Sequence, residues 1–147
     1  MTLKLLDWPP VWTLAHMALA WLMALVWAPL NVEAMFIGWV VIGAALVLMG
    51  WSALAMMRAG TTIIPGGEPA ALVTRGPFRI TRNPIYLADL AVLAGFSLAI
   101  GQPLGLLLVW PLKVVLERRF VLPEEAVLAE TFPDQFAAWR AQTPLQL

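Results

Sequence analysis

The sequence predicts an all-α integral membrane protein with about four transmembrane helices, the last two forming a short hairpin, and a C-terminal amphipathic helix on the cytosolic side. Hydrophobic residues make up 61% of its 147 residues and charged residues 12%. Residues 11–28 contain one ionisable side chain, that of His16, and residues 34–57 contain none. Each run is therefore long enough to cross a hydrocarbon core of about 30 Å.

The composition also limits the classes of function. The chain has no cysteine and zero formal net charge, which argues against a disulfide framework, a thiolate metal site and binding to nucleic acid. Its length predicts one domain, residues 1–147. Within it we distinguish a membrane scaffold of two helices, residues 1–57, from a second half, residues 58–147, that carries the polar motifs.

The first predicted helix covers residues 11–28 and follows Trp8, which is placed to lie at the level of the lipid headgroups. His16 lies about one and a half turns inside this helix. We expect it to face another helix and hydrogen-bond there, with a contact to a substrate as the alternative. A cleaved signal peptide with Lys4 as its basic end is a second interpretation, which the length of the run and the spans after it disfavour.

The second predicted helix covers residues 34–57 and carries Gly38, Gly43 and Gly50 for close approach of another helix. A long connection follows, residues 58–83, rich in threonine, proline and glycine. Connections of this length are usually functional or disordered, and the apolar Leu72-Val73 pair favours an ordered one.

A third helix is expected from Ile85 to Ile100, begun by Asn83 as the capping residue and Pro84 at its first position. Its free N–H groups and positive dipole end point at the preceding loop. Together they predict an anion-binding site, or seat for an anion, formed with the three arginines of that loop: Arg75, Arg79 and Arg82. The alternative is that these arginines only mark the cytosolic membrane face.

The fourth span is expected over residues 104–116, after a turn at residues 101–103, with a kink at Pro111. A separate amphipathic segment should start at Pro123, followed by Glu124 and Glu125, which either bind a ligand or only favour the helix dipole. Its apolar stripe would lie on the bilayer or cover the loop, and Pro133 should bend it. The stripe comprises Leu128, Phe132, Phe136 and Trp139.

The basic residues predict the orientation. If four spans alternate, all nine fall on one side of the membrane, which the positive-inside rule makes the cytosolic side. Both termini would then be cytoplasmic, in a bacterial inner membrane. The nine are Lys4, Arg58, Arg75, Arg79, Arg82, Lys113, Arg118, Arg119 and Arg140.

A ligand for this face needs anionic groups, a flat ring and hydrogen-bond donors. Phe78 and Tyr86 are placed to stack on a ring, and Glu124 and Glu125 accept hydrogen bonds. S-adenosylmethionine has all of these features, and nucleotides fit nearly as well. Asp89 lies one turn after Tyr86 and should face the protein or the headgroup region rather than lipid.

The motif Leu72-Val73-Thr74-x-Gly76-Pro77-Phe78-Arg79-x-x-Arg82-Asn83-Pro84-x-Tyr86, followed after a hairpin by Glu124-Glu125-x-x-Leu128, resembles the isoprenylcysteine carboxyl methyltransferase and phospholipid methyltransferase superfamily. The resemblance runs roughly from Thr61 to Trp139. It implies a membrane enzyme that takes S-adenosylmethionine from the cytosol and methylates a lipophilic acceptor, a carboxylate or an amine, reached from the bilayer. Membrane lipids and a lipophilic substrate are then its expected partners.

By position, the resemblance assigns Ala70, Ala71, Leu72, Val73, Phe78, Asn83, Pro84, Ile85, Tyr86 and Glu124 to the cofactor pocket. From the residues themselves we add Arg82 and Glu125 to that pocket and expect Asp89 and His16 to contact the substrate. Glu124 and Arg119 are the catalytic candidates, and Arg119, which adjoins the position of the family's substrate arginine, is also expected at the substrate. The chain departs from the family pattern at several positions, with Phe120 where prenylcysteine enzymes have an arginine and Asn83 where many members have histidine.

Two other functions are compatible with parts of the sequence. Membrane sterol-type reductases resemble the C-terminal half and use a nicotinamide dinucleotide, so hydride transfer is one alternative. A small four-helix transporter or scaffold is the other, and it would leave the long arginine-bearing loop unexplained.

Overall fold

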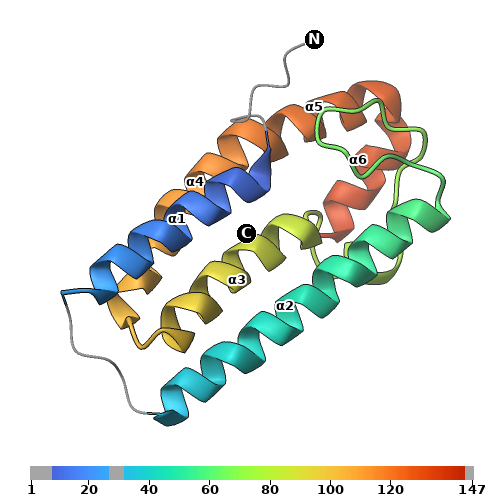
Figure 1. Ribbon diagram of the computed structural model, residues 1–147. Helices are drawn as coiled ribbons and strands as arrows, with labels where there is room; N and C mark the ends of the chain where they lie inside the picture. The colour runs from blue at the N-terminus through green and yellow to red at the C-terminus, as the bar shows by residue number, and fades with distance from the viewer. Residues whose placement is uncertain (1–7, 27–31, 145–147) are drawn as a thin grey trace.

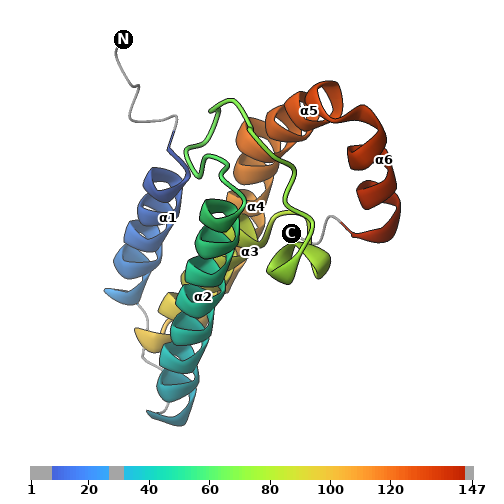
Figure 2. The same cartoon turned by 90° about the vertical axis from the view of Figure 1, so that its right-hand side faces the viewer.

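The computed structural model describes residues 8–26 and 32–144, and in this part of the chain the regular structure is helical. Four helical segments lie side by side: α1 (Pro9–Ala24), α2 (Val32–Arg58), α3 (Pro84–Ala99) and α4 (Val109–Leu116). The loop between α2 and α3, together with α5 (Leu122–Thr131) and α6 (Pro133–Gln142), gathers at one end of this bundle (Figures 1 and 2).

Helix α2 is the element that relates the fold to a membrane. Within the described residues, it is the one helix of at least 18 residues that is long and apolar enough to cross a bilayer, and only 11% of its most apolar window is buried. Large side chains such as Trp39 and Val47 are exposed on it, which water would oppose and lipid would favour. The helix predicted over residues 34–57 is confirmed, and it is a candidate membrane span.

The count of four spans is not confirmed by the other helices. Helix α1 ends at Ala24, and the end of the predicted 11–28 span lies outside the described residues. Helix α3 has the predicted bounds to within a residue, and its 16 residues give about 24 Å of helix. The fold is therefore all-helical in its described part, with one clear membrane-spanning candidate.

Helices α2 and α3 approach closely because each presents a glycine to the other. A Cβ atom built on Gly38 would lie 2.6 Å from the Gly95 carbonyl oxygen, and one built on Gly95 would lie 2.8 Å from that of Gly38. Gly38 thus serves the predicted role in helix approach. Gly43 and Gly50 do not, since a Cβ atom added to either would meet nothing within 4 Å.

The C-terminal part corrects the predicted break before Pro123. A 3₁₀ segment, η3 (Pro103–Leu108), leads into α4, and a π-helical turn, η4 (Glu117–Val121), joins α4 to α5 without interruption. The Leu122 N–H donates to the Glu117 carbonyl five residues back. The wider turn lets the chain pass through Pro123, which has no N–H of its own, so the segment after the fourth span continues as one bent rod.

Pro133 ends α5 rather than only bending it, and α6 starts there. Phe136 and Trp139 of α6 are buried against Phe78 of the loop, and the Trp139 Nε1–H donates to the Phe78 carbonyl oxygen at 3.0 Å. Of the two predicted placements for the apolar stripe, covering the loop is the one observed.

We predict that Gly38→Ala destabilises the protein, while Gly43→Ala does not. The added methyl at position 38 meets the backbone of α3, which cannot move aside as a side chain can, so about 1–3 kcal/mol should be lost. At position 43 the methyl has free space and alanine is the better helix former. Thermal unfolding in detergent measures both, and equal midpoints would contradict the close approach of α2 and α3.

Candidate functional site

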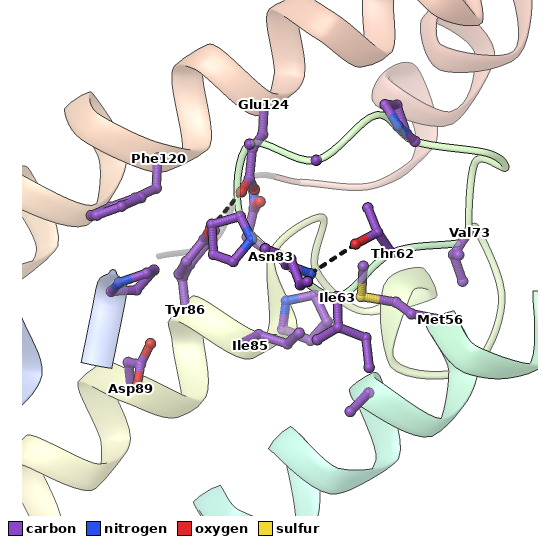
Figure 3. Close-up of a pocket in the computed structure, with 18 of the residues that line it drawn as sticks. Met56, Thr62, Ile63, Val73, Asn83, Ile85, Tyr86, Asp89, Phe120 and Glu124 are labelled. Carbon is purple, nitrogen blue, oxygen red and sulfur yellow. Dashed lines mark hydrogen bonds between the residues drawn. The ribbon is translucent and has the colours of Figure 1, made fainter. Parts of the chain in front are cut away.

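A cavity of about 1140 Å³ lies where the loop, α5 and the start of α3 meet α1 and α2 (Figure 3). At one end it is lined by loop residues 61–69 and 71–73 and by the first turns of α3 and α5. At the other end it continues between α1 and α2, where Leu14, Met17, Leu46 and Met49 line it. One space therefore connects a polar region outside the bundle with an apolar region inside it.

The loop holds its shape through its threonines and glycines. The Thr61 hydroxyl accepts a hydrogen bond from the Ala70 N–H at 3.2 Å, and the Thr62 hydroxyl accepts one from the Ile64 N–H at 3.0 Å. Gly60 and Gly66 adopt positive φ angles of 70° and 72°, which favour glycine. These contacts fold the connection back over the end of the bundle, as expected for an ordered loop.

Helix α3 begins after Asn83 as predicted, but by a different contact. The Asn83 side chain makes no capping bond, whereas its N–H donates to the Thr81 hydroxyl at 3.2 Å and its carbonyl accepts from the Leu87 N–H at 3.0 Å. The side chain is turned toward the loop and lines the cavity (Figure 3). The predicted capping role of Asn83 is wrong for this reason, and its amide is directed at the cavity instead.

Tyr86 and Glu124 join α3 to α5 across the cavity. The Tyr86 hydroxyl donates to Glu124 Oε1 at 2.7 Å, and the Tyr86 ring packs against Phe120 with centroids 6.2 Å apart. Partial burial raises the pKa of Glu124, while hydrogen bonds from the Tyr86 hydroxyl and the Gly66 backbone partly offset that rise. Glu124 is thus a hydrogen-bond acceptor whose charge is sensitive to what fills the cavity.

The three arginines of the loop do not converge on one anion, which corrects the predicted seat. Arg82 Nε lies 2.9 Å from Glu125 Oε1, and both side chains are about 90% buried, so its charge is neutralised within the protein. Arg75 and Arg79 are exposed and lie outside the cavity lining. The pair joins the end of the loop to α5, and the anion site reduces to the start of α3 itself.

The structure brings most of the predicted cofactor residues to the cavity. Those that line it are Ala71, Leu72, Val73, Phe78, Arg82, Asn83, Pro84, Ile85, Tyr86, Glu124 and Glu125. Ala70 does not line it; its N–H is bonded to Thr61.

Of the residues expected at the acceptor, Asp89 and Arg119 line the cavity and His16 does not. The His16 Nδ1 atom lies 2.8 Å from the Trp12 carbonyl oxygen, so the contact found for this side chain is within its own helix and not the expected one between helices. The Arg119 guanidinium lies 5.1 Å above the Trp12 ring, a cation–π contact that holds it at the edge of the cavity.

The sequence interpretation assigned His16 of α1 to the substrate and missed the α1 residues that line the cavity. Its inner face lines the cavity through Pro9, Thr13 and Met17 among others. Thr13 and His16 are the polar residues of this apolar helix, spaced so that they share one face. Polar groups in a membrane helix usually face the protein, so the Thr13–His16 spacing was the signal that identifies this inner face.

Arg82→Met should destabilise the protein by about 3–5 kcal/mol, because it leaves the Glu125 carboxylate buried without its partner. The double variant Arg82→Met/Glu125→Met should recover most of that loss. Arg79→Met, an exposed arginine of the same loop, serves as the control and should change the free energy of unfolding by less than about 0.5 kcal/mol. Thermal unfolding measures these changes. Equal effects of Arg82→Met and Arg79→Met would contradict a buried pair.

Comparison with known proteins gives the family. Residues 33–135 match the family model described as phospholipid methyltransferase, a range that includes α2, the loop, α3, α4 and α5 but not α1. No curated protein and no solved structure matches the sequence. The match extends over more than half of the chain, and with the apolar α2 it indicates a membrane protein with a methyltransferase fold. The chain belongs to the phospholipid methyltransferase family.

Proposed function

We propose that this protein transfers a methyl group from S-adenosylmethionine to a lipophilic acceptor at the cytosolic face of a membrane. The observation that carries the proposal is the single cavity with two ends of different chemistry. Its polar end suits a water-soluble methyl donor and its apolar end suits a lipid. Family membership supports methyl transfer as the reaction.

The residues at the polar end fit the parts of S-adenosylmethionine. The free N–H groups of the first turn of α3 suit the carboxylate of its amino acid portion. Leu72, Val73 and Phe78 offer an apolar slot for the adenine. The Glu124 carboxylate suits the ammonium group or the ribose hydroxyls, and the Arg82–Glu125 pair fixes the loop against α5.

The apolar end suits an acceptor that arrives through the bilayer. The cavity extends between α1 and α2 as far as Leu46, twelve residues before Arg58 at the end of α2, which corresponds to a depth of about 18 Å. A lipid tail in this space would place its head near Asp89 and Arg119. Arg119 is then available to hold an anionic part of that head.

Methyl transfer requires little of the protein beyond aligning the acceptor with the methyl group. The sulfonium group activates its own methyl carbon, so the protein has to place the acceptor in line with the carbon–sulfur bond and exclude water. A carboxylate acceptor needs no base, whereas an ammonium acceptor must first lose a proton, for which Glu124 and Asp89 are the nearest carboxylates.

The cytosolic orientation is supported by the basic residues around the site. Arg58, Arg82 and Arg119 lie at the end of the bundle that carries the loop, as do the ends of α2, α4 and the start of α3 (Figure 1). A concentration of arginine at one end of a membrane helix bundle favours that end as cytosolic. S-adenosylmethionine is made in the cytosol, which agrees with this orientation.

Isothermal titration with S-adenosylhomocysteine tests the donor site. The purified protein in a detergent that preserves its fold should bind it, and Glu124→Gln should weaken binding about tenfold or more, as expected for loss of a hydrogen bond to a charged group. Glu130→Gln removes an exposed carboxylate from the same helix and should leave affinity unchanged. Absence of binding to the folded wild-type protein would refute the proposed cofactor.

Binding should also depend on pH through Glu124. Its pKa is raised above the ordinary 4.5 by burial, and the ionised form is the one that accepts hydrogen bonds from the ligand. Lowering the pH through that raised pKa therefore protonates the carboxylate, so S-adenosylhomocysteine binding should weaken progressively as the pH falls, beginning above the ordinary carboxyl value of 4.5. Glu124→Gln should show a flatter profile over the same range, and an equally steep profile would assign the dependence to another group.

A further inference from the structure

A second, smaller hollow of about 420 Å³ lies between α6 and residues 72–79, which include the 3₁₀ segment η2 (Gly76–Arg79). It is distinct from the larger cavity, although Leu72 and Trp139 line both and so form a wall between them. Its volume falls within the range typical of small-molecule sites. We call it the η2–α6 hollow, and its polar lining consists of Thr74, Arg79, Gln135, Gln142 and Thr143.

The polar side chains of this hollow face one space and have no protein partner. Its α6 residues are 135, 138, 139 and 142, a spacing that places them on one face of the helix. The Trp139 Nε1–H donates to the Phe78 carbonyl oxygen at 3.0 Å, which turns that face toward η2. Within residues 8–26 and 32–144, none of the five polar side chains forms a hydrogen bond or an ion pair. Their donors and acceptors are therefore available to a ligand.

The charge of the hollow favours an anion that carries hydroxyl groups. Arg79 is the one ionisable side chain among the described residues that line it, and a guanidinium can donate two parallel hydrogen bonds to a phosphate. The other polar side chains are neutral amides and hydroxyls, which pair well with the hydroxyl groups of a ligand. Next to the lining in sequence, the exposed Arg75 and Arg140 are basic and the exposed Asp134 is acidic. An ammonium group would find no carboxylate in this lining.

The hollow lies beside the end of the membrane helix α2. The buried cluster that includes Phe78 packs against Met56 in the last turn of α2, and a Cβ atom built on Gly76 would lie 3.4 Å from Trp51 Nε1. Since α2 ends at Arg58, η2 lies next to its last two turns (Figures 1 and 2). Tryptophan and arginine near the end of a membrane helix are typical of the headgroup region, where lipid phosphates lie.

We propose that the η2–α6 hollow binds a phosphate ester that carries hydroxyl groups, supplied by the head of an anionic phospholipid. Arg79 holds the phosphate, and the amides of Gln135 and Gln142 hydrogen-bond the hydroxylated part of the head. A phospholipid with an ammonium head is disfavoured because the lining offers no carboxylate to pair with it. This site goes beyond the proposed function, since it lies outside the cavity assigned to methyl transfer and does not depend on that reaction.

The site is tested by isothermal titration of short-chain phospholipids into the purified protein in dodecyl maltoside at low ionic strength. Dihexanoylphosphatidylglycerol should bind the wild-type protein, and Arg79→Met should weaken this binding about tenfold or more, as expected for loss of hydrogen bonds to a charged group. The double variant Gln135→Ala/Gln142→Ala should weaken it severalfold. Arg75→Met removes an exposed arginine of the same loop that does not line the hollow, and as the matched control it should change the affinity by less than about twofold.

Two further probes test the head and the tails separately. Dihexanoylphosphatidylethanolamine can also enter the larger cavity, so for this lipid the informative quantity is the effect of Arg79→Met, which should be less than about twofold. Glycerol 1-phosphate has the phosphate and the hydroxyl groups without tails. Weaker Arg79-dependent binding of this ester than of dihexanoylphosphatidylglycerol assigns the site to a lipid, whereas binding of equal strength assigns it to a soluble phosphate ester.

The inference is overturned if dihexanoylphosphatidylglycerol binds wild type and Arg79→Met with equal affinity, or if Arg75→Met weakens its binding as much as Arg79→Met does. An equal loss of affinity for the glycerol and the ethanolamine lipid in Arg79→Met would also overturn the preference for a hydroxylated head. Thermal unfolding of each variant, with an unchanged midpoint, shows that any loss of affinity arises at the hollow and not from unfolding.

Discussion

The hydrogen bond between Tyr86 and Glu124 connects the parts on which the site depends. It spans 38 residues of sequence and joins the start of α3 to α5. The loop is enclosed between these two helices, and the Arg82–Glu125 pair lies beside the bond. Together with that pair, the bond supplies the polar contacts by which α5 meets the start of α3 at the cavity.

The membrane requires the irregular backbone and the closely packed helices of this small chain to lie in separate regions. Backbone outside helices must satisfy its hydrogen bonds away from lipid, so the irregular residues between α2 and α3 gather at one end, where threonine side chains and α6 cover them. The bundle itself needs only close packing, which Gly38 and Gly95 provide. A polar site and an apolar groove thus arise next to one another from the same constraint.

Much of this arrangement could be predicted from local pattern. The apolar run of α2, the Asn83-Pro84 start of α3 and the apolar stripe that includes Trp139 follow from run length, helix-start chemistry and spacing, but the stripe by itself did not decide between the bilayer and the loop. The site was harder to predict, because pairing is a property of three dimensions. In the sequence, Arg82 is one of three arginines in the same loop, together with Arg75 and Arg79. What distinguishes it in the structure is the position of Glu125 on the adjacent helix.

The contribution of α1 and the continuity of α4 with α5 were not predicted for related reasons. Thr13 lines the cavity together with Asp89, which is more than seventy residues away in sequence. Pro123 suggested a helix start, since proline is typical of that position, yet it also fits a π-helical turn when the turn supplies the missing bond elsewhere.

That turn makes the position of Glu124 less sensitive to chain length than an unbroken α-helix would. A residue in an α-helix is rotated by about 100° from its neighbour, whereas a π-helical turn closes its hydrogen bonds over five residues instead of four and so takes up one more residue. Loss of one residue between Glu117 and Val121 would relax η4 toward α-helix and rotate α5 much less than the same deletion elsewhere in the rod. The turn is therefore the place where this rod can change in length while Glu124 stays near Tyr86 and Glu125 near Arg82.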